Sequence, residues 1–156
     1  MNFIEGGVCA AKGFYANGVH SGIRKNKTKK DLSLIYSEKR ASTVAVYTKN
    51  KVKGAPLTVT KEHLKDGYAQ AVICNSGNAN TCNANGIEVA ESTCVAIANE
   101  LKLSSADIVV ASTGVIGQVL DVAPIVNAIP ELVKGLAKDK SQDAAEGITF
   151  MLDWYK

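Results

Sequence analysis

The residues best suited to do chemistry lie in the stretch DIVVASTGVIG, residues 107–117. A short apolar run ends there in a serine, a threonine and a glycine: Ser112, Thr113 and Gly114. A threonine hydroxyl followed by a glycine N–H offers two adjacent donors, the arrangement that stabilises an oxyanion in acyl transfer. Because glycine lets the backbone turn sharply, a Thr-Gly pair after a strand is more often a plain turn. Both interpretations stay open on the residues alone.

Two other chemistries fit this stretch less well. A phosphate-binding loop needs GxxxxGK followed by Ser or Thr, and STGVIGQ has the wrong spacing and no lysine. A serine nucleophile elbow needs GxSxG, but Ser112 stands between Ala111 and Thr113. The pair of donors at Thr113 and Gly114 is therefore the candidate oxyanion hole.

A second polar stretch, NSGNAN at residues 75–80, places three asparagines around one glycine. Asparagine side chains hold tight turns by bonding to nearby backbone groups, which is the simple interpretation. The alternative is a polar scaffold that supports the wall of a site. His20 and His63 have no neighbouring cysteine or carboxylate pattern, so we expect surface or core roles for them.

Composition limits the function classes. The four cysteines (Cys9, Cys74, Cys82 and Cys94) form no CxxC pair and have no histidine at metal spacing, so we expect reduced, cytoplasmic thiols and no metal. The net charge is +3, and five of the basic residues lie in RKNKTKK, residues 24–30. Without aromatic residues or a recognition helix beside it, this run indicates a solvated turn between strands, not a nucleic-acid site. No secretory signal and no apolar run of ~20 residues is present, which predicts a cytoplasmic protein without membrane contact.

The elements that must position these residues form one domain over residues 1–156, since no repeat or composition break divides the chain. Alternating apolar residues predict strands at 31–37, 42–48, 56–60, 69–75 and 108–111, with Glu38-Lys39-Arg40 as a connector and 76–86 as a loop.

Helices are predicted from Ile87 to Leu101, with Asn85 and Glu88 as a capping box, and after Asp121, with Pro124 in the first turn and Pro130 as an interruption. A last helix begins at Ser141. The order of strand, helix and strand predicts an α/β fold, a mixed sheet with flanking helices.

Several motifs together resemble one family. GGVCAAKGF, GVHSGIRK, DLSLIYS, NKVKGAPLTVTKEHLKDG, NSGNANTC, ASTGVIGQ and DAAEGI follow one another from Glu5 to Ile148. In this order they resemble the N-terminal, α-chain part of the ornithine acetyltransferase family, the bifunctional glutamate N-acetyltransferases of arginine biosynthesis. NSGNAN and ASTGVIG are the most specific of these signals.

The resemblance implies a precursor that cuts itself before a threonine. The new N-terminal threonine takes the acetyl group from N-acetylornithine as an ester and passes it to glutamate, with its α-amine as the local base. Thr113 and Gly114 match the oxyanion hole of the family. The resemblance also implies a layered sandwich completed by a second, β chain that begins with Thr, and thus a hetero-oligomer of α and β chains. No cofactor is implied, and acetyl-CoA as a further acetyl donor is left open.

The last eight residues, TFMLDWYK at 149–156, depart from the family pattern. No self-cleavage site is found there, so the nucleophile is expected on a segment outside this sequence and the isolated chain is expected to be inactive. One hypothesis is therefore the α-like part of an acetyltransferase that needs a threonine-led partner. The other is an inactive remnant or accessory domain that keeps only the fold.

Overall fold

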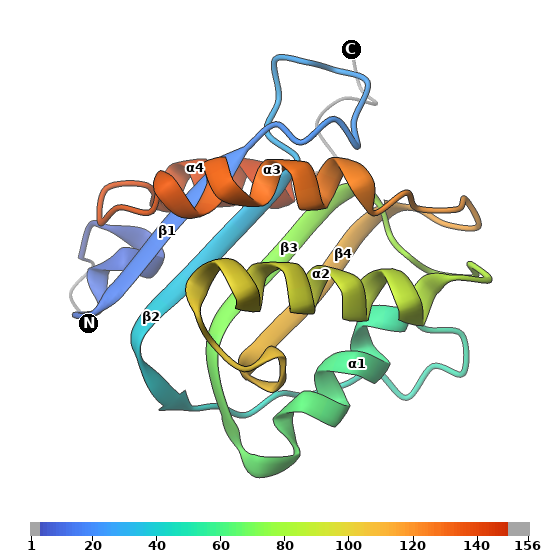
Figure 1. The fold of residues 1–156 in the computed structure, drawn as a ribbon, viewed down its shortest axis with the longest axis horizontal. Helices are drawn as coiled ribbons and strands as arrows, with labels where there is room; N and C mark the ends of the chain where they lie inside the picture. Colours follow the sequence, from blue (N-terminus) through green and yellow to red (C-terminus); the bar gives the residue numbers. More distant parts are fainter. Residues whose placement is uncertain (1–3, 150–156) are drawn as a thin grey trace.

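The computed structural model describes residues 4–149 as a mixed four-stranded sheet with four α-helices (Figure 1). The strands are β1 (Phe14–Val19), β2 (Leu32–Ser42), β3 (Tyr68–Asn78) and β4 (Ile108–Val115). The helices are α1 (Ala55–His63), α2 (Gly86–Leu101), α3 (Ala123–Lys134) and α4 (Ser141–Ile148), with short 3-10 turns at Gly7–Ala10, Leu64–Asp66 and Ser105–Asp107. The predicted α/β class is confirmed. The predictions for residues 150–156 lie outside the described residues.

The strands follow the order β1-β2-β3-β4 across the sheet. β1 and β2 are antiparallel, β2 and β3 are antiparallel, and β3 and β4 are parallel. The crossover from β3 to β4 contains α2, as expected for parallel neighbours. The carboxyl ends of β3 and β4 therefore lie side by side at one edge of the sheet (Figure 1).

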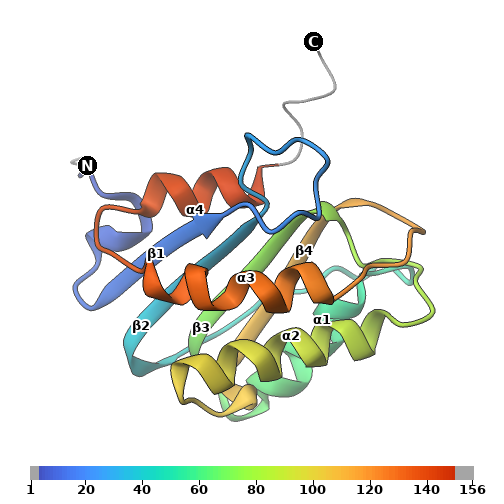
Figure 2. The same cartoon turned by 45° about the horizontal axis from the view of Figure 1, so that its top comes forward.

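Helices cover both faces of the sheet. Asn17 in β1 donates from Nδ2 to the carbonyl oxygen of Leu132 in α3, at 2.9 Å. The next residue, Gly18, lies against α4, since a Cβ there would be 2.0 Å from the carbonyl oxygen of Asp143. Neighbouring residues of a strand point to opposite faces, so α3 and α4 lie on opposite sides of β1 (Figure 2).

The main core lies on the face shared by α2 and α3. Leu32, Leu34, Ile73 and Ile108 from the strands are at most 1% exposed, and they pack with buried residues of the two helices: Ile97, Ile125, Ile129 and Leu132. The predicted helix over Ile87–Leu101 is α2, and it covers one sheet face as expected.

Both outer edges of the sheet are closed by side chains or backbone from other elements. Along β4, the Thr60 hydroxyl of α1 donates to the Val110 carbonyl oxygen at 2.8 Å and accepts from the Val110 N–H at 3.1 Å. His63 lies nearby with Nδ1 2.8 Å from the carbonyl oxygen of Ile108. On the other edge, Ala16 and Ala137 exchange two backbone hydrogen bonds of 3.1 Å. An open edge strand is thus avoided on both sides.

Beyond α4, the second face of the sheet is only partly covered. Phe14, Ile35 and Val72 are half-buried there and line an open cavity of about 400 Å³ together with Ala41–Val44.

Residues 31–48 form one long strand where two were predicted. β2 runs from Leu32 to Ser42 through Glu38-Lys39-Arg40. Residues 32–37 pair with β1, residues 32–36 and 41–42 pair with β3, and the connector lies in the register shift between Tyr36 and Ala41. The predicted second strand, 42–48, is wrong beyond Ser42. Val44 and Val46 there are 93% and 98% exposed, and none of the strands in residues 4–149 pairs with them.

The predicted strand at Pro56–Thr60 is wrong, since these residues belong to α1. Proline is favourable in the first turn of a helix. The β-branched pair Val59 and Thr60 is buried, with Thr60 bonded to β4. Contact with the sheet edge therefore outweighs the strand propensity of these residues.

Three further details differ from the prediction. Asn85 makes no side-chain cap to α2: its Nδ2 donates to the Leu120 carbonyl oxygen at 3.3 Å, and its Oδ1 accepts no hydrogen bond from residues 4–149. Pro130 lies inside α3 without ending it, since Ile129 and Leu132 on either side are fully packed in the core. β1 was not predicted; its Ala16, Asn17 and Gly18 are small or polar because helices pack against both faces.

Candidate functional site

The predicted site residues lie at the carboxyl end of β4. Ile108 and Val110 point into the core, so by alternation Ser112 shares their face and Thr113 points to the opposite one. Ser112 Oγ donates to Oδ1 of Asn75 in β3 at 2.6 Å. Thr113 is partly exposed, and its hydroxyl makes no hydrogen bond with any residue in 4–149. One hydroxyl of the pair is therefore used by the fold, and the other is available.

Gly114 cannot be replaced without moving the neighbouring strand. Its φ is +129°, and a Cβ there would lie 2.4 Å from the carbonyl carbon of Gly77 and 2.6 Å from the Asn78 nitrogen. Gly77 and Gly114 are paired in the parallel register, so two glycines bring the two backbones together at the sheet edge. This close approach, and not a free turn, accounts for glycine at position 114.

The asparagine stretch is a hydrogen-bonded scaffold beside Thr113. Asn75, Asn78 and Asn80 are each at most 5% exposed. Asn75 Nδ2 donates to the Asn78 carbonyl oxygen at 2.9 Å, and Asn78 Nδ2 donates to the Gln118 carbonyl oxygen at 3.0 Å. Asn80 donates its N–H to Asn78 Oδ1 at 2.8 Å and its Nδ2 to the Gly86 carbonyl oxygen at 2.8 Å.

These contacts confirm that the asparagines hold a turn, and they show which segments the stretch joins. The side chains hold the turn, and they also join β3 to the loop after β4 and to the start of α2. The predicted loop boundary is wrong for residues 76–78, which continue β3 because they pair with Thr113–Val115.

A third segment at this edge comes from the connection between β1 and β2, which contains the basic run. The buried carboxylate of Asp31 accepts hydrogen bonds from the N–H groups of Ser21 (2.5 Å), Gly22 (3.2 Å) and Arg24 (2.9 Å). A single side chain thus folds the start of this loop. The run lies between two strands, as predicted, and Lys25–Thr28 are exposed.

Arg24 links this loop to the end of α4 and to β3. Its Nη1 donates to the Thr149 carbonyl oxygen at 2.7 Å. A Cβ on Gly77 would lie 2.8 Å from Arg24 Cγ, so the arginine stem lies directly against the carboxyl end of β3. The chain therefore leaves α4 at the same sheet edge as Thr113 and Gly114 (Figure 2).

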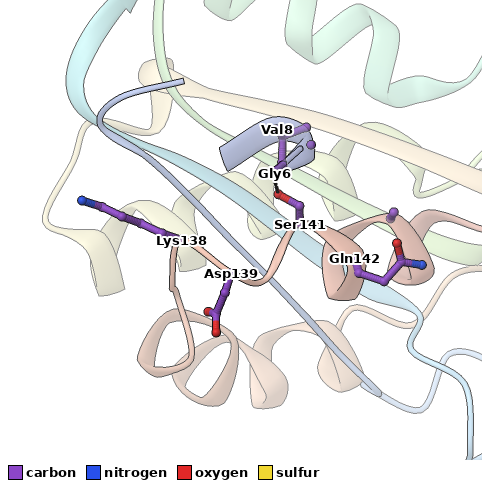
Figure 3. Close-up of a pocket in the computed structure, with 8 residues that line it drawn as sticks. Gly6, Val8, Lys138, Asp139, Ser141 and Gln142 are labelled. Atoms are coloured by element: carbon purple, nitrogen blue, oxygen red, sulfur yellow. Dashed lines mark hydrogen bonds between the residues drawn. The ribbon is translucent and has the colours of Figure 1, made fainter. Parts of the chain in front are cut away.

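The cavities add few further residues to the candidate site. A cavity of about 220 Å³ lies at this edge, between Gly22 and Ile23 on one side and Gly77, Asn78 and the loop at 118–121 on the other. A larger one of about 400 Å³ lies between the N-terminal turn and the start of α4 (Figure 3). There the Ser141 hydroxyl donates to the Gly6 carbonyl oxygen at 2.5 Å. That cavity holds none of the predicted site residues.

The cysteines are unsuited to nucleophilic chemistry in two cases. Burial raises the pKa of Cys74 and of Cys94 to about 12, so both thiols stay protonated at neutral pH. Within residues 4–149 no three His, Cys, Asp or Glu side chains gather closely enough to hold a metal ion. No helix of that part of the chain is both long and apolar enough to cross a bilayer.

Sequence reasoning placed Thr113 and Gly114 but missed the residues that support them. Asn75 and Ser112 each directly follow an apolar strand, and parallel pairing of these strands would have brought them together. Asp31 stands immediately before β2 without any other signal of its role. The Arg24 contact with Thr149 spans 125 residues and has no local signature.

Comparison with known proteins is consistent across sequence and structure. The chain is 43% identical over 149 residues to the arginine biosynthesis bifunctional protein ArgJ of Caldanaerobacter subterraneus, and 44% identical over 150 residues to that of Gloeobacter violaceus. Each match covers 95% of this chain. It covers only 36% and 37%, respectively, of the relative, so the chain spans about a third of their length.

Two solved structures have the same fold. The ArgJ protein of Bacillus halodurans matches with a TM-score of 0.85 and 39% identity, over 92% of this chain and 75% of that one. The ornithine acetyltransferase of Mycobacterium tuberculosis, solved in complex with ornithine, matches with a TM-score of 0.88 and 31% identity, over 94% and 80%. The sequence profile of the ArgJ family matches residues 15–150. This chain therefore belongs to the ArgJ family and corresponds to its N-terminal portion.

Proposed function

We propose that this chain supplies the oxyanion hole of an acetyltransferase that moves an acetyl group from N-acetylornithine to glutamate. The observation that carries the proposal is the hydroxyl of Thr113, which is partly exposed at the end of β4 and makes no hydrogen bond within residues 4–149. A hydroxyl held on a strand end beside a glycine, with no internal partner, is suited to donate to a ligand.

In this proposal the nucleophile is the N-terminal threonine of a second chain. Its hydroxyl oxygen attacks the acetyl carbonyl carbon of N-acetylornithine, while its α-amine takes the hydroxyl proton. The carbonyl oxygen becomes an oxyanion that accepts hydrogen bonds from Thr113 Oγ1 and the Gly114 N–H. Collapse breaks the bond to the ornithine nitrogen, which receives the proton, and leaves an acetyl ester on the threonine. The amine of glutamate then attacks that ester and regenerates the threonine.

Two features support a partner chain, one at the edge that holds Thr113 and one on the sheet face nearer the start of β3. The chain leaves α4 beside Arg24 and Gly77, at the edge that also holds Thr113 and Gly114. The half-buried sheet face lined by Phe14, Ile35 and Val72 leaves room for another layer beyond α4. We propose a hetero-oligomer of α and β chains in the cytoplasm.

The test is to combine this chain with a second chain that begins with threonine and to measure acetyl transfer from N-acetylornithine to glutamate. We expect transfer only with both chains. Thr113→Val should lower kcat about 10²–10³-fold, because the loss of one oxyanion donor costs about 2.7–4 kcal/mol. Thr113→Ser, which keeps the hydroxyl, should retain most activity.

A complex without transfer, or full activity of Thr113→Val, would overturn the proposal. Failure of the two chains to associate would favour the accessory-domain alternative. In the same assay, acetyl-CoA offered in place of N-acetylornithine separates an enzyme that uses both donors from one that uses a single donor.

A further inference from the structure

We propose that Asn75 is a positioning residue for the oxyanion hole, and that it acts on Thr113 through the hydroxyl of Ser112. This inference rests on the proposed function, because it gives a role in the same site to two residues that do not touch the substrate. The carrying observation is a side-chain bridge between β3 and β4 one residue before the Thr113–Gly114 pair.

The bridge has a fixed direction. Asn75 is 4% exposed, and its Nδ2 donates to the Asn78 carbonyl oxygen at 2.9 Å. A carbonyl can only accept, so this bond decides which end of the amide is nitrogen and turns Oδ1 toward Ser112. Ser112 must then be the donor at 2.6 Å, a short distance for a neutral O–H···O bond.

The bridge also lies beyond the last side-chain contact from α1 to the backbone of β4, although the backbone pairing of β4 with β3 continues to Val115. On the outer edge of β4, the side chain of Thr60 bonds to Val110, and no side chain of residues 4–149 forms a hydrogen bond with the backbone of Ser112, Thr113 or Gly114. Ser112 is therefore the last residue of the strand anchored by a side chain before the available hydroxyl of Thr113. Because neighbouring residues point to opposite faces, the anchor holds the strand from the core side and leaves the Thr113 face open.

This arrangement matters because donor geometry is demanding. An oxyanion donor works at about 2.7–3.1 Å from the developing charge, and a displacement of about 1 Å can cost about 10²-fold in rate. A strand end fixed by the amide of Asn75 keeps Thr113 and Gly114 in place before the substrate arrives. A loosened strand end would still bind substrate but would meet the transition state poorly.

The experiment uses the complex of the full chain with its threonine-led partner, and three variants. Ser112→Ala removes the donor with little change of volume, Asn75→Leu removes the acceptor, and the third variant combines both. We expect each single variant to lower kcat about 10-fold to 100-fold with KM within about twofold, and the double variant to be no worse than the poorer single one. Ser112→Thr, which keeps the hydroxyl, should restore kcat to within a few-fold of the unmodified complex.

The matched control is Thr93→Val in α2. Thr93 is buried, and its hydroxyl donates to the Val89 carbonyl oxygen at 2.8 Å, so the variant also loses one buried hydroxyl bond but outside the site. It should lower stability and leave kcat unchanged. An unchanged kcat in Ser112→Ala, or one that falls only as much as in Thr93→Val, would overturn this inference.

Thr113→Val separates the two ideas. If Thr113→Val is slow and Ser112→Ala is not, the positioning role of Asn75 is wrong while the oxyanion hole stands. If Thr113→Val is itself fully active, the proposed function fails, and the inference fails with it.

Discussion

The two polar turns at the carboxyl ends of β3 and β4 lie side by side but are held in different ways. The asparagine turn comprises residues 75–80, the end of β3 and the two residues after it, and its Asn75, Asn78 and Asn80 are buried and hydrogen-bonded through their side chains. The end of β4 has an anchored serine, Ser112, and then Thr113, whose hydroxyl makes no hydrogen bond within residues 4–149; a run of exposed residues, 116–119, follows the strand.

The difference shows that the side chains that make this edge rigid are not those that are available to a ligand. A side chain that satisfies its own fold has no donor left for a ligand, and an available donor contributes little to the fold. One turn stiffens the sheet edge so that the other can leave a hydroxyl available without losing its position. Substitution of a buried asparagine should therefore change stability, and substitution of Thr113 should change chemistry.

Gly114→Ala should have the largest effect on stability, because it breaks the contact between the two turns. The new Cβ would meet the backbone of Gly77 at 2.4 Å, and φ is +129°. Strain of about 1–3 kcal/mol and overpacking of about 1–3 kcal/mol should add in the free energy of unfolding. Equilibrium unfolding in urea, followed by circular dichroism, measures the loss.

Gly117→Ala is the control for that change. Gly117 has φ +79°, but a Cβ there would meet no atom within 4 Å. It should therefore show only the strain part of the cost, about 1 kcal/mol. Equal losses for the two variants would show that the approach to Gly77 is not what requires glycine at 114.

Asn80→Ala and Thr113→Val test the comparison directly. Asn80 is 1% exposed, and its removal breaks the buried bond from its Nδ2 to the Gly86 carbonyl oxygen, which should cost about 0.5–1.5 kcal/mol of stability. Thr113→Val keeps the volume and removes no internal bond, so the free energy of unfolding should change by less than about 0.5 kcal/mol. A larger loss for Thr113→Val than for Asn80→Ala would reverse the roles assigned to the two turns.

Sequence periodicity was sufficient for the parts of the fold whose residues repeat in a regular pattern. α2 and the apolar strands β3 and β4 were predicted near their observed places because their buried residues recur at helical or strand spacing. Thr113 and Gly114 could be singled out because their chemistry is local to three residues.

The missed parts depend on contacts between distant segments. Thr60 satisfies the edge of β4 from a helix, so a β-branched run that suggested a strand became α1. β1 has small and polar residues because two helices press on it, which no local pattern encodes. The bridge between Asn75 and Ser112 exists only when β3 and β4 are parallel and in register.

Labelling of the cysteine thiols tests whether the asparagine turn is rigid. Cys82 follows this turn and is exposed, whereas Cys94 is fully buried in α2. If the turn is rigid, iodoacetamide at pH 8 should label Cys82 and leave Cys94 unlabelled, as peptide mass analysis would show. Labelling of Cys94 at a similar rate would mean that α2 opens together with the turn.

The same thiols predict how stability depends on alkaline pH. The pKa of Cys94 is raised from 9.0 to about 12 by burial and, to a lesser extent, by Glu91. The folded state therefore holds this proton when the unfolded state has lost it, and stability should be constant below pH 9 and fall as pH rises toward 12. Unfolding at pH 7, 9 and 10 measures the decline, and Cys94→Ala, compared with itself across pH, should reduce it.

The smallest effect on stability is expected in the connection between β1 and β2. Ion pairs hold this loop, whereas amide hydrogen bonds hold the asparagine turn. Lys30 and Lys140 both pair with Asp143 in α4, and these two bonds lower the pKa of the Asp143 carboxyl below its usual 3.8. A lowered pKa means stability that is present above pH 4 and lost as pH falls further. Asp143→Asn removes this titrating group and should therefore weaken the acid dependence of unfolding between pH 3 and 5. The change should be small, because the ion pairs are partly exposed.

Asp139→Asn is the control, since Asp139 is exposed and forms no ion pair with residues 4–149. It should leave the acid dependence unchanged. Asn80→Ala, by contrast, should lose the same free energy at pH 4 and at pH 7, because amide hydrogen bonds do not titrate in that range. If the loss from Asn80→Ala instead varied with pH as strongly as that from Asp143→Asn, the two loops would be coupled, and the asparagine turn would not be an independent rigid support for Thr113.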